Sequence, residues 1–277
     1  MPRAWKLALL SAVIVSAPSM AQSPVRFKWE AGQTLTYRAE QVTSVSDITE
    51  KQKIETSTKM ILTKRWQVLS VDEAGVATLQ MSLLALRMET RKPDRETIVF
   101  DSSDTDPANA KLNKDLLQYV GPPLATLKLD SLGRLVEVKE SKFGSASRYT
   151  SDLPFKITLP DKTVTAGESW ERTYQIKLEP PQGAGETYDA VQKYTCKSAT
   201  VTLLIIGMTT TIKNLPEAPA DQIPLIPMQA EGRVVFSLAD GRMQKAELTI
   251  AHELTDHRGE GSKYTFRSTY VEELIEK

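Results

Sequence analysis

The chain has one cysteine and two histidines among 277 residues. A single cysteine cannot form an intramolecular disulfide, so stability has to come from core burial and backbone hydrogen bonds. Cys196 lies in a strand-like run, which favours a buried and inert thiol.

His252 and His257 are five residues apart, and this odd spacing on a strand points the two rings to opposite faces. We therefore expect no shared zinc site, and we expect both histidines to be exposed at strand ends. No Gly-x-Ser-x-Gly elbow indicates acyl-transfer chemistry.

An excess of either charge is also lacking. Lysine and arginine total 35, aspartate and glutamate total 35, and the formal net charge is zero. Basic residues occur at most in short groups such as Lys64-Arg65. A near-neutral chain has no long-range field to hold nucleic acid or an anionic membrane, so we expect no nucleic-acid partner.

Long apolar runs are missing as well, apart from the N-terminus. Arg3 and Lys6 precede an uncharged apolar stretch at 7–17, and small residues follow at Ser19 and Ala21. This order is typical of a secretory signal peptide, and the apolar stretch is too short to span a bilayer. We expect residues 1–21 to be a signal peptide cleaved near Ala21, which predicts a secreted or periplasmic protein. An uncleaved N-terminal anchor is the alternative. We expect no integral membrane segment in the remaining chain.

Apolar residues recur with a period of two over most of the chain. They alternate at 35–39, at 60–68, at 77–83, at 234–238 and at 246–250. Strands place successive side chains on opposite faces, so this pattern predicts sheets with one dry face. Near Leu83-Leu84 the apolar set changes from odd to even positions, which predicts a β-bulge or a bend.

Turn residues separate these runs. Asp72–Gly75, Asp130–Arg134 and Asp240–Gly241 predict hairpins. One segment, at 107–120, shows helical spacing, and 142–152 could add a turn of helix. The proline-rich stretch 216–227 is interpreted as an extended surface connection.

The predicted fold is therefore all-β and mainly antiparallel. It comprises one or more large twisted sheets or a half-barrel, with one short helix near 107–120. The sequences around Gly32 and Gly167, each at the start of a predicted strand, are similar. Gly-Arg turns also occur twice, at 133–134 and at 241–242. These repeats favour two similar β halves at 22–150 and 151–277. One continuous domain is the alternative.

Four segments carry a family resemblance: Phe-Lys-Trp-Glu-Ala-Gly-Gln-Thr-Leu-Thr-Tyr at 27–37, Val-Phe-Asp-Ser at 99–102, Asp-Ser-Leu-Gly-Arg-Leu at 130–135 and Ala-Gly-Glu-Ser-Trp at 166–170. In this order the chain resembles exported bacterial proteins of uncharacterised β-rich families, that is, domains of unknown function. The resemblance implies no catalytic residues. The architecture is similar, more distantly and at the level of fold alone, to the half-barrels of periplasmic lipoprotein carriers.

A candidate cation site lies in one acidic loop. Asp101, Asp104 and Asp106 could supply oxygen ligands to calcium, although the loop lacks the glycine and the final glutamate of an EF-hand. The alternative is ordinary loop chemistry, with Asp106 capping the following helix. We expect no other cofactor.

A candidate ligand groove rests on the segment 201–206, which is apolar on both sides. A strand covered on both faces is one interpretation. In the other, Trp66, Leu203 and Ile205 line a groove on a curved sheet. The leading functional hypothesis is a non-catalytic extracytoplasmic binding or structural protein, with a hydrophobic small molecule or lipid as its partner. The alternatives are a carboxylate-dependent hydrolase and an envelope module that binds another envelope protein by strand addition.

Overall fold

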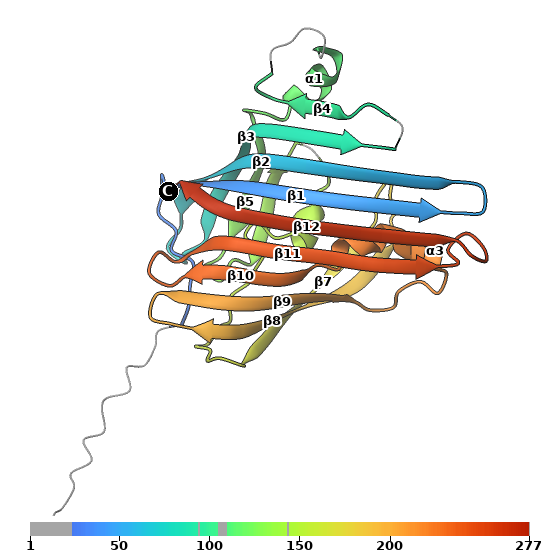
Figure 1. Cartoon of the computed structure of the whole chain (residues 1–277). Coiled ribbons are helices and arrows are strands. Elements are labelled where there is room, and N and C mark those ends of the chain that lie inside the picture. Colours follow the sequence, from blue (N-terminus) through green and yellow to red (C-terminus); the bar gives the residue numbers. More distant parts are fainter. Residues whose placement is uncertain (1–23, 94, 105–109, 143, 277) are drawn as a thin grey trace, which may run out of the picture.

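The computed structural model describes residues 24–93, 95–104, 110–142 and 144–276. They form one twelve-stranded antiparallel sheet (Figure 1). This confirms the all-β prediction. The strands are β1 (Thr34–Ile48), β2 (Lys53–Val71), β3 (Ala77–Arg91), β4 (Ile98–Asp101), β5 (Pro123–Leu129), β6 (Leu135–Ser141), β7 (Ser169–Lys177), β8 (Thr187–Ala199), β9 (Leu203–Ile212), β10 (Glu231–Ser237), β11 (Arg242–Thr255) and β12 (Lys263–Glu276).

The spatial order of the strands is β6-β5-β3-β2-β1-β12-β11-β10-β9-β8-β7, and β4 pairs with the far end of β3. The strands of 22–150 thus occupy one side of the sheet and those of 151–277 the other. The first and last strands, β1 and β12, join them in the middle. Whether these two halves arose by duplication or form separate domains stays a prediction.

The hairpin turns lie where the sequence predicts them. Gly75, Gly133 and Gly241 all have positive φ, which glycine adopts without a Cβ clash. In the β5–β6 turn the Asp130 carboxylate accepts two backbone N–H bonds of 2.8 and 2.9 Å. A Cβ on Gly133 would lie 2.5 Å from the ring of Phe27, so this glycine also admits the N-terminal segment.

Bulges interrupt the pairing and bend the sheet. Thr63 pairs with Ala85 and Lys64 pairs with Leu83, so Leu84 is left over. This confirms the face change predicted there. Similar register shifts occur between β1 and β12, β10 and β11, and β8 and β9. Each bulge adds local twist, and the sheet curls so that β7 lies behind the long central strands (Figure 1).

The concave face is filled by the connection between the two edge strands, β6 and β7. Leu159 of this connection donates its N–H to the Leu132 carbonyl, and the Trp170 indole donates to the Thr158 carbonyl at 2.7 Å. The first bond ties the connection to the β5–β6 turn, and the second ties it to β7. The connection therefore spans the gap between the two edges.

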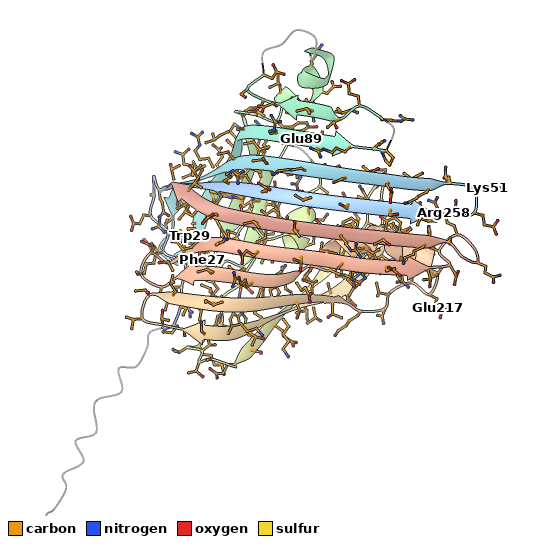
Figure 2. All side chains as sticks on the ribbon, in the orientation of Figure 1. Phe27, Trp29, Lys51, Glu89, Glu217 and Arg258 are labelled. Atoms are coloured by element: carbon orange, nitrogen blue, oxygen red, sulfur yellow. The ribbon has the colours of Figure 1, made fainter. Side chains whose placement is uncertain are left out.

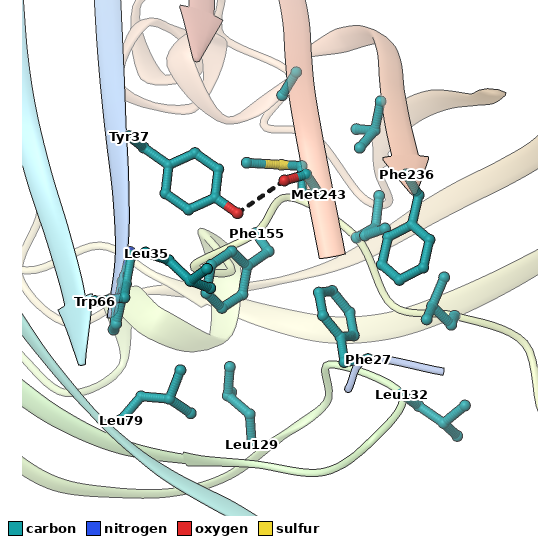
Figure 3. Packing of buried hydrophobic residues seen from close by; sticks show 14 of the residues in the cluster. Phe27, Leu35, Tyr37, Trp66, Leu79, Leu129, Leu132, Phe155, Phe236 and Met243 are labelled. Carbon is teal, nitrogen blue, oxygen red and sulfur yellow. Dashed lines mark hydrogen bonds between the residues drawn. The ribbon is translucent and has the colours of Figure 1, made fainter. Parts of the chain in front are cut away.

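Phe155, on this connection, lies at the centre of the main core (Figure 3). Its ring centroid is 5.5 to 5.8 Å from those of Phe27, Trp29, Tyr37 and Trp66. Such spacings are typical of favourable aromatic packing. Three parts of the chain therefore meet at one side chain: the N-terminal segment, β1 with β2, and the β6–β7 connection.

Short helices complete the fold. They are α1 (Ala110–Leu117), α2 (Arg148–Ser151), α3 (Pro219–Gln222) and the 3-10 helix η2 (Ile223–Met228). The helix predicted at 107–120 is confirmed over its described part. The prediction of an extended surface connection at 216–227 is wrong: the prolines open helical turns, and Leu225 and Ile226 are buried. Leu225 joins a second hydrophobic cluster over β7, β8 and β9.

The convex face is polar. It carries ion pairs such as Lys59–Glu40 at 2.9 Å and Arg87–Glu89 at 2.8 Å, which contribute little each because water screens them. Charged side chains also mark the hairpin tips at one end of the long strands, where Figure 2 places Lys51 and Arg258, away from Phe27 and Trp29. None of the helices that the structure describes has the length and apolar character needed to cross a membrane.

Replacing Phe155 with alanine tests the importance of the connection. The change removes an aromatic side chain that is 2% exposed and leaves a cavity among four rings. We expect a loss of about 3–5 kcal/mol in the free energy of unfolding, measured by urea denaturation. Val136→Ala, at an exposed position of β6, is the control and should change the stability by less than about 0.5 kcal/mol. Equal losses of stability in the two variants would contradict the central role of Phe155 in the core.

Candidate functional site: a pocket on the concave face

A pocket of about 320 Å³ lies on the concave face, immediately beyond the main core. The core uses Tyr37 of β1 and Ala246 of β11, whereas the pocket uses inward-facing positions further along the same strands, Gln41 and Ile250. The pocket is closed on its other sides by α2, by the residues after α2, and by η2. Its volume lies at the lower end of the range found for small-molecule sites.

Part of the pocket lining is apolar, and we call this set of residues the apolar wall. These residues come from β7, β9 and β11, from the end of η2 and the segment after it, and from the segment after α2. They are Leu153, Tyr174, Met208, Pro227, Met228, Ala230, Leu248 and Ile250. Met208 and Leu248 also belong to the main core, whereas Tyr174 and Met228 pack on the second cluster. The apolar wall is therefore backed by both hydrophobic clusters.

The lining also contains charged residues, which we call the charged wall. Of the described residues that line the pocket, four are ionised at neutral pH: Arg148, Asp152, Lys156 and Arg172. Three of them lie on α2 or directly after it, and Arg172 lies on β7. Their formal charges sum to two positive charges. Gln192, Thr210 and Ser268 add neutral polar groups at the base. The pocket is thus amphipathic, and three of its four charged residues come from the segment 148–156.

Lys156 occupies a special place in this wall. Its φ is +62°, a left-handed conformation that costs a residue with a Cβ roughly 1–2 kcal/mol. The conformation reverses the chain directly after Phe155, so Phe155 enters the core while the Lys156 ammonium reaches the pocket. The ammonium lies 2.5 Å from an Asp152 carboxylate oxygen and 4.9 Å from the centre of the Tyr270 ring.

The Lys156–Asp152 pair is exposed unequally. The Lys156 side chain is 11% exposed, whereas that of Asp152 is 70% exposed. Burial alone would lower the pKa of Lys156, but the Asp152 carboxylate and the more distant Glu272 outweigh it and raise the pKa. The protein atoms around the Asp152 carboxylate would raise its pKa, but the charge and the hydrogen bond of Lys156 outweigh this effect and lower it. Both groups are therefore charged at neutral pH.

Arg172 fixes the charged wall to the sheet. Its guanidinium donates to the carbonyls of Thr150 and Ser151 in α2, at 2.8 and 3.1 Å, and to the Gln192 side chain at 2.8 Å. It also stacks on the Tyr174 ring, 4.2 Å from its centre. One guanidinium thus satisfies carbonyls at the end of a four-residue helix that has little stability of its own.

A second ionic group lies beneath the pocket. Glu272 of β12 is fully buried, and its carboxylate lies 2.5 Å from the Lys64 ammonium of β2. The Tyr270 hydroxyl donates to the same carboxylate at 2.6 Å and accepts from Lys64 at 3.1 Å. Because β1 lies between β2 and β12, this cluster links two strands that are not direct neighbours in the sheet. Burial, followed by the Glu272 charge, raises the pKa of Tyr270 well above its ordinary value, so the hydroxyl stays protonated.

The predicted groove residues do not come together. Trp66 is 3% exposed and packs in the main core on the concave face. Leu203 and Ile205 occupy the opposite face of β9, because their neighbours Leu204 and Ile206 are the core residues. The apolar segment therefore has one buried and one partly solvated face.

Two of the three predicted calcium ligands, Asp101 and Asp104, lie near the edge of the sheet. Asp101 ends β4, where its carboxylate accepts from the Ser103 hydroxyl and backbone N–H at 2.6 and 2.9 Å, and from Arg87 at 2.8 Å. These bonds lower the pKa of Asp101 to about 2, the Ser103 bonds contributing most. Asp104 lies in the loop that follows, and Asp106 lies outside the described residues. Calcium binding stays a prediction.

The histidine prediction is wrong in one respect. His257 is buried, not exposed, and its Nε2 lies 3.0 Å from Asp47 in the β1–β2 turn region. His252 lies on the concave face of β11. Cys196 is buried and unpaired, and burial raises the pKa of its thiol, as expected for an inert cysteine. Over the part of the chain that the structure describes, no cluster of three or more His, Cys, Asp or Glu side chains is arranged to hold a metal.

Sequence reasoning missed the pocket. Three of its four charged residues lie in 148–156, a segment with no strong periodicity. The one usable signal was the Asp152-Leu-Pro-Phe-Lys156 run, in which two charges flank an apolar core sequence. In the sequence, the strand residues of the apolar wall look like ordinary inward-facing core positions, so they do not indicate a pocket.

No family model matches the chain, and no curated protein matches it. Among solved structures, a lipovitellin structure concerned with lipid–protein interactions is similar over 90% of this chain, with 10% identity and a TM-score of 0.47. The chain spans 26% of that lipovitellin chain. An outer membrane channel from Pseudomonas putida F1 is similar over 94% of this chain and all of its own, with 9% identity and a TM-score of 0.29. DynF from the dynemicin pathway of Micromonospora chersina aligns over 100% of this chain and 94% of its own, with 9% identity and a TM-score of 0.24. These similarities are too weak to assign a function.

The buried ionic cluster should behave as a unit. Glu272→Gln leaves the Lys64 ammonium, 14% exposed, without a carboxylate, and we expect a loss of about 3–5 kcal/mol in the free energy of unfolding. Adding Lys64→Met removes the isolated charge and should restore most of the loss. Denaturant unfolding of the two single variants and the double variant measures the coupling. Additive losses would show that the two side chains act independently.

Asp101 predicts a pH dependence. Its folded pKa is below its ordinary value, so its stabilisation is complete above that ordinary value and is lost as the pH falls from about 4 to about 2. Asp101→Asn should therefore cost about 1–2 kcal/mol at pH 7 and almost nothing near pH 2, measured by urea unfolding across this range. Glu96→Gln, at an exposed position, is the control. A loss that does not vary with pH would contradict the role of the Asp101 charge.

Proposed function

We propose that this protein is a non-catalytic extracytoplasmic binding protein that holds a small amphiphilic molecule, such as a single-chain lipid, in the concave-face pocket. The observation that carries the proposal is the division of the pocket lining between apolar and charged residues. An amphiphile has the same division. Its chain would lie against Met208, Leu248 and Ile250, and its head group would face α2.

The apolar wall supports this reading energetically. Each methylene group transferred from water to an apolar site contributes about 0.8 kcal/mol, so a chain of about eight methylenes contributes roughly 6 kcal/mol before the cost of immobilisation. Methionine side chains suit such a role, because they adapt to chains of different shape. Met208 and Met228 both line the pocket.

The charged wall supports it as well. A purely apolar ligand would leave Lys156 and Asp152 against hydrocarbon, which is costly for ionised groups. A ligand with a polar head group keeps these charges solvated or paired. The N-terminal signal expected at 1–21 is consistent with work outside the cytoplasm, where a water-insoluble molecule needs a carrier.

Ile250→Trp tests the proposal by filling the pocket. Ile250 is partly exposed on the concave face, so an indole can extend into the pocket without replacing a core residue. We expect delipidated wild-type protein to bind one decyl-chain amphiphile per chain in native mass spectrometry. The variant should bind at least ten times more weakly, measured by isothermal titration calorimetry.

Ala251→Trp is the matched control, because Ala251 is the next residue of β11 and lies exposed on the convex face. It should bind as the wild type does. Circular dichroism checks that both variants keep the strand content. Equal binding by the two variants, or no binding by the wild type, would refute the proposal.

A further inference from the structure

We infer that the ligand is an anionic single-chain amphiphile, and that its acidic head group replaces Asp152 as the partner of the Lys156 ammonium. This inference rests on the proposed function and names the ligand class for the same pocket.

The first argument is the charge balance of the wall. Arg148, Lys156 and Arg172 are positive and Asp152 alone is negative among the ionised groups lining the pocket. The chain as a whole is neutral, so this excess is local. An added carboxylate or phosphate would bring the wall closer to neutrality, whereas a cationic head group would increase its charge.

The second argument is the position of Lys156. Its backbone is strained, and its side chain is largely removed from water, yet it reaches the pocket. Residues held in sparsely populated conformations often serve a site rather than the fold alone. The Tyr270 ring beneath the ammonium and the Phe155 anchor hold it in place, so an anion meets a cation that needs no rearrangement.

The third argument is the asymmetry of the ion pair. Asp152 is mostly exposed, so its carboxylate can turn towards solvent and regain hydration when another anion arrives. The Lys156 ammonium cannot become hydrated in the same way without leaving its position in the charged wall. Asp152 is therefore a replaceable partner, one that satisfies the ammonium while the pocket holds no anion.

Arg172 supplies charge without being displaced. Its guanidinium donates to two α2 carbonyls and to Gln192, and these bonds hold the wall together. The head group is thus bound mainly by Lys156, with Arg172 and Arg148 adding favourable potential. A ligand that needed to break the Arg172 bonds would also unfold α2.

The test compares decanoate, decanol and decyltrimethylammonium, which share a chain and differ in head-group charge. Binding to delipidated protein is measured by calorimetry at low ionic strength. We expect decanoate to bind at least ten times more tightly than decanol, and decyltrimethylammonium most weakly. Added salt should weaken decanoate binding more than decanol binding.

Three variants identify the groups. Asp152→Asn removes the competing carboxylate with little change in shape and should tighten decanoate binding severalfold. Lys156→Met keeps the side-chain stem and should abolish the preference for decanoate over decanol. Lys162→Met is the control, because it removes a positive charge of the same connection that is 78% exposed and outside the pocket. It should leave the preference unchanged.

The opposite directions expected for Asp152→Asn and Lys156→Met separate head-group recognition from a structural role. If the pair only stabilised the fold, both variants would weaken binding. The inference is overturned if decanol binds as tightly as decanoate, if Lys156→Met keeps the preference, or if Asp152→Asn weakens decanoate binding. Failure of all three amphiphiles to bind would instead refute the proposed function itself.

Discussion

The fold depends on the insertion of Phe155, which lies on the connection between the two edge strands, into the aromatic cluster on the concave face of the sheet. A twelve-stranded open sheet has a concave face that strands alone do not cover, and that face has to be buried for the sheet to be stable. Here the β6–β7 connection crosses the gap and places one aromatic ring against four others. The same connection then turns at Lys156 and forms the charged wall of the pocket.

The core and the candidate site are therefore made by neighbouring residues. Phe155 points into a dry cluster, and the next residue points into an amphipathic pocket. The left-handed backbone at Lys156 allows both orientations. An extended segment would also point successive side chains in opposite directions, but it would not reverse the direction of the chain over α2. Below them, the Lys64–Glu272 pair gives the interior a second charged layer. A change in the backbone at Phe155 and Lys156 would therefore affect both the stability of the core and the shape of the pocket.

The sheet was predictable from the sequence because its signals are local. Alternation at 35–39 and at 246–250, the glycine turns at 75, 133 and 241, and the face change at Leu84 each depend on a few adjacent residues. The helical cover at 216–227 was misread because prolines exclude a central strand but permit the first turn of a helix. Short helices of this kind are decided by what they pack against, in this case the cluster around Leu225.

The candidate site was not predictable in the same way. Met208, Leu248 and Tyr270 look like any inward-facing strand residues, and only the curvature of the sheet brings them around one pocket. The predicted groove placed Trp66 with Leu203 and Ile205, since a run that is apolar at every position does not reveal which face is buried. Lys156 and Asp152 acquire their relation through a backbone conformation that no sequence pattern announces.

The pairing of β1 with β12 has a consequence for how the protein is made. Residues 36–48 find their partners at 263–276, so the central seam of the sheet joins the two ends of the described chain. Until the last strand is available, β1 has a bare edge of thirteen unpaired positions, which invites pairing with other chains. Loop closure over more than 200 residues also makes this seam slow to form. Each half of the sheet can pair its own strands first, so the complete sheet closes in one late step, when β12 reaches β1.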